Sequence, residues 1–438
     1  MGTKVNANPT KEFFISMLTR DIDIKAAILE LIDNSIDGAK RLRPDGNYDG
    51  LFIEISYDKD KFSIKDNCGG MSIETATQYA FRFGRSNDRP SDKDSQQHFT
   101  GIFGIGMKRS LFRLGEYFEV SSKTTTDYFK LQVDVDEWVK KDDVDWSFQL
   151  SEELTGQNYS DEETGTLITV SKLHKGISEQ FSLTYFMNML VSYIEKYRTI
   201  AVENGLQITV NGKTIVYSSQ EIVETKNVTP YAFSKTIDDV NISVIAGIAP
   251  KGEPENAGWY VYCNGRLVIF ADKTQLTGWG EDQVRQYHPS LAFFRGFVFF
   301  ESSNLEKLPW NTTKTGVDSS SSYYIFAKSK MKEALIQMIK SCKVIADDLP
   351  EDISNSIFKK ANLKPINSSY IARITSTDKS FDIVIPEIEK KEPTASITFS
   401  KPQKIVEVVK KRMKVSTNRD VGITAFDYYV RKECDIDE

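Results

Sequence analysis

The sequence contains few cysteines and few histidines, and this scarcity excludes several kinds of site. Its 438 residues include four cysteines and three histidines. The cysteines are Cys68, Cys263, Cys342 and Cys434. They lie far apart and form no C-x-x-C pair, so we expect reduced thiols rather than a zinc site or a disulfide framework. The histidines are equally isolated, so local sequence builds neither a histidine metal cluster nor a Ser/His/Asp triad.

The sequence also lacks an apolar run of the length that crosses a membrane. Residues 1–14, MGTKVNANPTKEFF, contain no apolar stretch like that of a signal peptide. We therefore expect a cytoplasmic protein with no membrane partner. The formal net charge of −6 argues against a generally basic coat for nucleic acid, while a local basic patch remains open. The length allows roughly two to three domains.

What is present is an amphipathic helix with an acidic face, predicted over residues 26–40, AAILELIDNSIDGAK. Its apolar residues recur at helical spacing and are Leu29, Ile32, Ile36 and Ala39. Glu30, Asn34 and Asp37 follow i, i+4, i+7 on a separate stripe. No positive charge occurs between residues 26 and 39, so we expect that something outside the helix, such as a cation, neutralises its carboxylates.

Two further motifs follow this helix. Residues 65–71 read KDNCGGM, and residues 101–110 read GIFGIGMKRS. The order E-x-x-x-N, then D-x-x-x-G-M, then G-x-x-G-x-G-x-K resembles the GHKL ATPase superfamily, which includes gyrase B subunits, Hsp90-like chaperones, histidine kinases and MutL. The resemblance covers roughly residues 9–323 and implies ATP and Mg²⁺ as cofactors.

The fold that this resemblance implies is α+β. Residues 1–180 would form a Bergerat-type α/β sandwich ATP-binding domain with an N-terminal strap. Residues 181–346 would form an S5-like α/β transducer domain, and residues 347–438 a small C-terminal segment for partner binding or dimerisation. Apolar and polar side chains alternate along several segments of residues 117–171, and this pattern favours a mixed, mainly antiparallel sheet. A helix predicted over residues 182–200 opens the second part, in which two Asn-Gly pairs predict hairpins.

The resemblance also assigns roles to the acidic stripe. Glu30 would orient and deprotonate the attacking water. Asn34, one turn away on the same face, would ligate the Mg²⁺ that bridges the phosphates. Asp37 would contribute to the nucleotide site.

Asp66 falls where a strand ends and would bind the adenine amino group. Thr166, in the pair Gly-Thr before a strand, would support it. One departure concerns Cys68, which stands where the family pattern D-x-G-x-G has its first glycine. We expect a slightly reshaped loop in which Gly70 and Met71 keep their places and nucleotide binding survives.

A polar segment precedes the third motif. Residues 86–98, SNDRPSDKDSQQH, contain no large apolar side chain, so we expect a mobile loop there, and the resemblance makes it an ATP lid. The glycines that follow would let backbone amides face phosphate oxygens, and the helix opening near Met107 would add its dipole. The expected nucleotide contacts here are Gly84, Ser86, Gly101, Phe103, Gly104, Ile105, Gly106, Met107 and Lys108.

Superfamily members send a basic residue from the second domain back to the terminal phosphate. Here residues 310–316, WNTTKTG, form a polar, turn-prone loop after an apolar strand. Lys314 is the expected phosphate contact and Lys307 is the alternative. Residues 9–23 are either a strap that crosses to a second subunit or a simple lead-in helix.

The runs ELIDNSID and FGRS, together with the joined second domain, look closest to MORC-type ATPases and their prokaryotic relatives. We therefore expect an ATP-hydrolysing switch, a homodimeric clamp closed by ATP, with DNA or a protein as a possible client. An Hsp90-like chaperone acting on protein clients is an alternative, as is a nucleotide-dependent scaffold with little turnover. The chain beyond residues 347–351 is lysine-rich and is either a nucleic-acid or partner surface or a set of ordinary solvated helix faces. Its basic residues include Lys359, Lys360, Lys390, Lys391, Lys410, Lys411 and Arg412.

Overall fold

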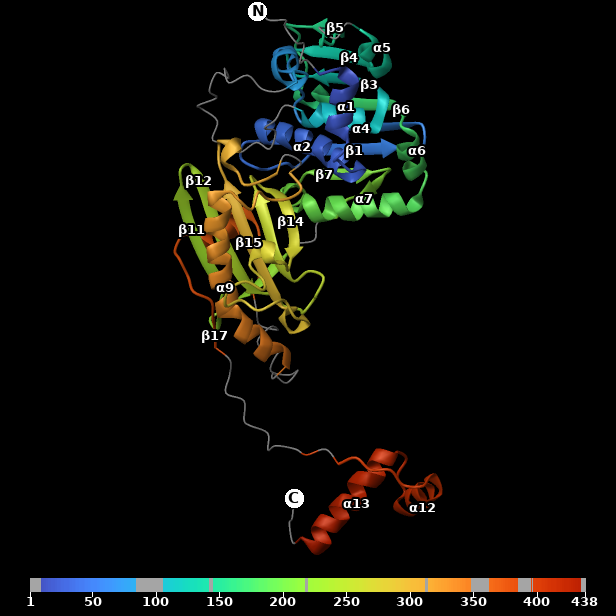
Figure 1. The fold of residues 1–438 in the computed structure, drawn as a ribbon, viewed down its shortest axis with the longest axis vertical. Coiled ribbons are helices and arrows are strands. Elements are labelled where there is room, and N and C mark those ends of the chain that lie inside the picture. Colours follow the sequence, from blue (N-terminus) through green and yellow to red (C-terminus); the bar gives the residue numbers. More distant parts are fainter. Residues whose placement is uncertain are drawn as a thin grey trace, which may run out of the picture. The chain divides into compact units, whose positions relative to one another are not determined.

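The computed structural model of the chain describes residues 9–83, 105–141, 145–216, 220–311, 314–347, 362–384, 395 and 397–434. The chain forms two compact units, Met1–Val384 and Ile385–Glu438. In the first unit, two large β-sheets lie in two packed parts of the chain, each with helices of its own (Figure 1). The mixture of helices and large sheets confirms the α+β prediction.

The first part is built on an eight-stranded sheet of order β5-β4-β3-β6-β2-β1-β7-β8. Its strands are β1 (Phe52–Tyr57), β2 (Lys61–Asp66), β3 (Gly115–Lys123), β4 (Tyr128–Asp134), β5 (Leu150–Leu154), β6 (Gly165–Leu173), β7 (Gln207–Val210) and β8 (Lys213–Thr214). Neighbouring strands run antiparallel except for β1 and β7, which are parallel. The sheet is therefore mixed and mainly antiparallel, as the alternation of the sequence predicted.

Helices cover this sheet, and the central one is α2. The helices are α1 (Lys11–Thr19), α2 (Ile24–Leu42), α3 (Ile73–Thr75), α4 (Gly106–Leu114), α5 (Val135–Lys140), α6 (Lys175–Phe181), α7 (Thr184–Tyr197) and α8 (Thr199–Glu203). Helix α2 begins after Asp23, whose carboxylate accepts the backbone N–H of Ala26 at 2.7 Å. It packs along α4 and buries Leu29 and Ile32 in the core of this part.

Helix α1 packs on its own domain. The side chain of Lys11 is buried, and its Nζ donates to the carbonyl oxygens of Trp138 at 3.0 Å and Lys141 at 3.1 Å. Phe14 meets Phe83 and Trp146 edge to face, with ring centroids 5.1 and 5.2 Å apart. Residues 11–19 therefore form a helix that packs on the same chain.

The second part contains a five-stranded sheet of order β11-β12-β15-β13-β14. Its strands are β11 (Tyr231–Ile237), β12 (Val240–Ile248), β13 (Gly258–Cys263), β14 (Arg266–Asp272) and β15 (Phe294–Glu301). Alternate side chains of β12 enter two different cores: Val244 packs in the cluster that includes α9 (Ser322–Asp347), and Ile245 packs in the one that includes α11 (Ser368–Ile374). Both faces of this sheet are therefore covered.

Both predicted Asn-Gly hairpins are confirmed. Asn211 and Gly212 join β7 to β8, and Asn264 and Gly265 join β13 to β14. All four residues have positive φ, between 46° and 79°. This is the left-handed pair of conformations that a two-residue type I′ turn requires.

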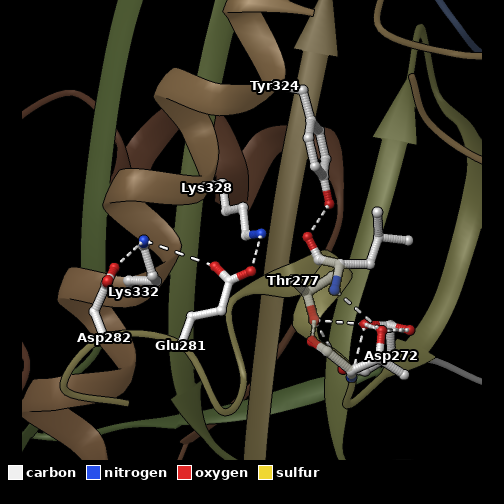
Figure 2. A network of polar contacts seen from close by, with 9 residues as sticks. Asp272, Thr277, Glu281, Asp282, Tyr324, Lys328 and Lys332 are labelled. Carbon is white, nitrogen blue, oxygen red and sulfur yellow. Dashed lines mark hydrogen bonds and ion pairs between the residues drawn. The ribbon is translucent and has the colours of Figure 1, made fainter. Parts of the chain in front are cut away.

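The connection between β14 and β15 is tied to α9 by a polar network (Figure 2). Tyr324 Oη donates to the carbonyl oxygen of Leu276 at 2.9 Å. Lys328 Nζ lies 2.8 Å from a carboxylate oxygen of Glu281, and Lys332 Nζ lies 3.8 Å from the other. The chain that leaves the end of β14 is therefore braced against a long helix.

Two short sheets tie a later segment to the first unit. Strand β16 (Asn362–Pro365) pairs with β9 (Glu221–Glu224), and β17 (Asp382–Ile383) pairs with β10 (Val228–Thr229). The first compact unit thus ends at Val384, whereas the sequence led us to expect a C-terminal segment beginning at residue 347. Pairing between strands that lie more than a hundred residues apart leaves no mark in local composition.

The second unit contains α12 (Gln403–Met413) and α13 (Asn418–Glu433), and neither helix buries a residue. Large apolar side chains are exposed on both, among them Val408 at 69% and Tyr429 at 61%. Within the described part of the chain, no helix combines the length and apolar character needed to cross a membrane.

Candidate functional site

The acidic stripe of α2 is largely buried. Glu30 is 8% exposed and Asp37 is 6% exposed, and Asp37 forms an ion pair with Lys40 at 3.7 Å. Asn34 is the one exposed residue between residues 26 and 39, all of which the structure describes. The predicted metal ligand is thus exposed within an otherwise buried stretch of α2, and a ligand could reach its amide oxygen.

The charges that neutralise Glu30 and Asp33 of α2 come from both parts of the first unit. Lys314 Nζ lies 2.7 Å from Glu30 Oε1, and Arg266 Nη1 lies 3.0 Å from Glu30 Oε2. The same Arg266 nitrogen also contacts Asp33 Oδ2. The remaining oxygen of Asp33 lies 2.7 Å from Arg198 Nε. The positive charge that the sequence led us to expect from outside α2 is therefore supplied by Lys314, Arg266 and Arg198 of the same chain.

These contacts set the protonation of Glu30. Burial by itself would raise the pKa of Glu30, but Lys314 and Arg266 lower it from the ordinary value to about 2. The same pairing raises the pKa of Arg266, because Asp33 and Glu30 outweigh the effect of burial. Glu30 is therefore a carboxylate at every physiological pH, and both of its oxygens are bound to cations.

The carboxylate of Asp66 lies on strand β2, opposite Thr166 on β6. Its Oδ2 accepts from Ser35 Oγ at 2.6 Å, and its Oδ1 accepts from the backbone N–H groups of Cys68 at 2.9 Å and Thr166 at 3.2 Å. Burial raises the pKa of Asp66, and these hydrogen bonds oppose the rise. A carboxylate has about four acceptor sites, so one is left after these three hydrogen bonds.

Ser122 links Met71 and Thr166, two residues that the sequence predicted to contact the nucleotide. Its Oγ accepts the backbone N–H of Met71 at 2.8 Å and lies 2.9 Å from Thr166 Oγ1. Sequence reasoning missed this residue, because a serine within a strand gives no local signal. Its side chain is almost fully buried, so the loop after Asp66 is anchored to the middle of the sheet.

The loop after Asp66 shows how a cysteine is tolerated in a glycine motif. Cys68 is buried, while the positions with positive φ are Gly69 at 83° and Gly70 at 67°. A Cβ on Gly70 would overlap the carbonyl oxygen of Lys123. The glycines therefore occupy the positions where the backbone is left-handed or lies close to another strand. The position of Cys68 has neither constraint, so it accepts a side chain.

Gly106 begins α4, and the half-buried Ile105 and Met107 flank it. A Cβ on Gly106 would overlap Oε1 of Glu30. The Glu30 carboxylate thus lies directly against the first turn of α4, the end of a helix that attracts anions. The other predicted contacts of this region, Gly84, Ser86, Gly101, Phe103 and Gly104, lie outside the described residues.

The side-chain amine of Lys108 is bonded to backbone carbonyl groups. Its side chain is fully buried, and Nζ donates to the carbonyl oxygens of Ala80 at 2.6 Å and Arg82 at 2.8 Å. Burial lowers the pKa of Lys108 to about 7. The structure thus places this amine beneath the end of the π-helix Ala76–Ala80, just before the polar segment.

The two lysines proposed as the phosphate contact differ in their surroundings. Lys314 is 4% exposed, adopts a left-handed backbone conformation with φ 52°, and reaches Glu30. Lys307 Nζ instead donates to the carbonyl oxygen of Asp238 at 2.7 Å and to Asp239 Oδ2 at 3.2 Å. Of the two, Lys314 is the one that the fold brings to α2.

Sequence reasoning missed Arg266, Arg198 and Asp33. The Asn-Gly turn predicted the hairpin that carries Arg266, but not the element its guanidinium would reach. The predicted helix over residues 182–200 is broken at Arg198, whose backbone (φ −125°, ψ 24°) is not helical. The uncompensated charge of α2 was the only local signal that such cations had to exist.

Residues 22–166 match the model of a family described as histidine kinase-, DNA gyrase B-, and HSP90-like ATPase. The match supports a GHKL-type ATP-binding domain. It includes Glu30, Asn34 and Asp66 and ends at Thr166, so the cations that hold Glu30 lie beyond the matched residues. No curated protein matches the chain.

Proposed function

We propose that the protein is a Mg²⁺-dependent ATPase that works as a homodimeric clamp closed by ATP, similar to MORC-type ATPases. The observation that carries the proposal is the position of Glu30. Its carboxylate lies against the first turn of α4 and is bonded to Lys314 of the second part at 2.7 Å. A candidate general base, a helix N-terminus and a cation from another part of the fold thus meet at one point.

The residues around this point suit ATP. Asp66 keeps an acceptor for the exocyclic amine of adenine after its three internal hydrogen bonds. The exposed amide of Asn34 would hold Mg²⁺, which when bound offsets the negative charge of the phosphates. Glu30 would accept a proton from the attacking water.

Lys314 would link hydrolysis to the second part of the unit. In this structure its ammonium is bonded to Glu30. A terminal phosphate carries more negative charge than one carboxylate and would compete for that ammonium. Transfer of Lys314 to the phosphate would release one oxygen of Glu30 and move the loop that carries Lys314. Lys314, which senses the phosphate, and Glu30, which acts as the base, would then respond together to ATP.

The clamp is supported by a surface that a second copy would cover. Phe13 and Met17 lie one turn apart on α1 and are 61% and 53% exposed. DNA as a client is supported by the basic last turn of α12, formed by Lys410, Lys411 and Arg412. Neither surface includes Glu30, so both parts of the proposal can be tested separately from turnover.

The experiment is ATP turnover of the full chain with Mg²⁺, measured alone and with duplex DNA, alongside nucleotide binding. Glu30→Gln should bind ATP and hydrolyse it roughly 10²- to 10⁴-fold more slowly, the loss expected for a general base. Sedimentation should shift from monomer towards dimer only with a non-hydrolysable ATP analogue. Normal turnover by Glu30→Gln would overturn the catalytic assignment, and an unchanged monomer with analogue bound would overturn the clamp.

A further inference from the structure

We propose that Arg266 is a positioning residue for the Glu30 carboxylate and that Asp33 holds Arg266 in this role. The inference rests on the proposed ATPase function, because it concerns the same carboxylate. It adds a link between α2 and the β13–β14 hairpin, in addition to the link between α2 and the loop of Lys314.

The contacts of Arg266 join two carboxylates of one helix. Its Nη1 lies 3.0 Å from Glu30 Oε2 and also contacts Asp33 Oδ2. Glu30 and Asp33 are three residues apart and therefore lie on the same side of α2. The guanidinium is planar and its N–H groups point in fixed directions, so it can hold both carboxylates in one geometry, whereas an ammonium is a point charge. All three side chains are nearly excluded from solvent.

The backbone that carries Arg266 is held at both ends of β14. Next to the turn, the Asn264 amide donates to the carbonyl oxygen of Ser302 at 2.9 Å and accepts the Ser302 N–H at 3.0 Å. Lys40 of α2 donates to the carbonyl oxygen of Asn264 at 3.2 Å. At the other end, Asp272 accepts from Thr277 Oγ1 at 2.6 Å, within the network of Figure 2. Arg266 therefore starts from a fixed position.

Asp33 in turn holds the guanidinium, and its second oxygen is occupied by Arg198 at 2.7 Å. The chain of charges runs from Glu30 through Arg266 and Asp33 to Arg198. Lys314 contacts only the Glu30 end of this chain, through Oε1. If Lys314 moves to a phosphate, Arg266 still holds Oε2, and Oε1 remains directed at the first turn of α4.

The test compares Arg266→Gln, Arg266→Lys and Asp33→Asn in the full chain by steady-state hydrolysis of ATP. Arg266→Gln should lower kcat by about 10²-fold, as expected when a catalytic group is misplaced by about 1 Å, with KM for ATP little changed. Arg266→Lys should recover part of the loss because it keeps the charge. Asp33→Asn should lower kcat less, and the double variant Asp33→Asn/Arg266→Gln should be no slower than Arg266→Gln, since both changes act on one unit.

Arg295→Gln is the matched control for loss of a buried arginine. Arg295 is 2% exposed, lies on β15 of the same sheet, and donates to the carbonyl oxygens of Ala292 and Phe294 at 2.9 and 3.0 Å. Its replacement should leave kcat close to that of the wild type. A loss of kcat in Arg295→Gln equal to that in Arg266→Gln would overturn the proposal, because the effect would then be general to the sheet.

The outcomes separate this inference from the proposed function. Normal turnover by Glu30→Gln sinks the proposed function itself. If Glu30→Gln is inactive while Arg266→Gln keeps its kcat or changes only KM, the positioning role alone is wrong. Thermal unfolding of each variant identifies any that does not fold. Should Arg266→Gln be such a variant, wild-type kcat in Asp33→Asn would overturn the inference, and reduced kcat with unchanged KM would support it.

Discussion

At the scale of single residues, the site is governed by how each carboxylate is satisfied. Glu30 is bound by two cations, whereas Asp66 accepts three neutral hydrogen bonds. The first arrangement lowers the pKa of Glu30 and the second leaves the pKa of Asp66 raised by burial. Two carboxylates within one part of the fold are therefore held in different ways, one by cations and one by neutral donors, and the proposed function gives them different roles.

Glu30 should contribute to stability in a defined pH window. Its pKa is about 2 in the folded protein against an ordinary value of 4.5, so its stabilising effect is full above pH 4.5 and disappears as the pH falls through about 2. The shift corresponds to about 3 kcal/mol. Urea unfolding of wild type and Glu30→Gln from pH 7 to pH 2.5 should show a difference of this order at neutral pH that shrinks on acidification. A difference independent of pH would contradict the ion pairs.

Asp66→Asn should lose nucleotide binding without losing the fold. The asparagine oxygen can still accept from Cys68 and Thr166, and its amide can donate to Ser35, whose hydroxyl can accept as well as donate. The fourth acceptor site is then lost, because the oxygen that holds it is replaced by the amide NH₂ group. A hydrogen bond to a charged group is worth about 1.5–3 kcal/mol, or roughly 10- to 100-fold in affinity. Calorimetric titration with ATP measures this. Equal wild-type affinity for GTP and ATP would contradict adenine recognition by Asp66.

At the scale of elements, the site depends on the close approach of α2 and α4. The structure allows this approach because Gly106 has no side chain where Glu30 meets the first turn of α4. The pattern of glycines predicted phosphate contacts for their backbone amides. The structure shows a second reason why a glycine stands at position 106, which is that the carboxylate of Glu30 on α2 occupies the space of a side chain there.

Gly106→Ala should reduce hydrolysis by roughly 10²-fold through displacement of Glu30 by about 1 Å. Alanine favours a helix over glycine by about 1 kcal/mol, so any loss of stability would report the clash rather than helix propensity. Gly422→Ala is the matched control, because a Cβ there meets no atom within 4 Å. It should leave turnover unchanged. Normal turnover in Gly106→Ala would show that Glu30 does not work from this position.

At the scale of the whole molecule, the first unit joins its two parts through charges on α2. Lys314 and Arg266 lie more than two hundred residues from Glu30 in the chain. Both are nearly buried, so their ion pairs are little screened by salt. Any ligand that competes for Lys314 would therefore change how the two parts are held together.

Lys314→Ala should keep near-normal affinity for ADP, which lacks the terminal phosphate, while hydrolysis and analogue-driven dimerisation both fall. Removing one partner of a buried pair also leaves Glu30 less compensated, so we expect a loss of roughly 3–5 kcal/mol in stability without nucleotide. Single-turnover hydrolysis and ADP titration test this. If Lys307→Ala gave the same pattern instead, the contact with Glu30 would not be the functional one.

The sequence by itself determined the local elements and their chemistry. The acidic stripe of α2, the strand that ends at Asp66 and both Asn-Gly hairpins follow from periodicity and turn conformation, which a few neighbouring residues encode. Only the tertiary structure decided which cations meet Glu30. That choice depends on where the β13–β14 hairpin and the loop of Lys314 reach α2, and the chain separates Arg266 from Glu30 by 236 residues. The uncompensated charge of α2 showed that the helix needs cationic partners. Charge does not specify which residues approach the helix, so only the packing of the chain determines them.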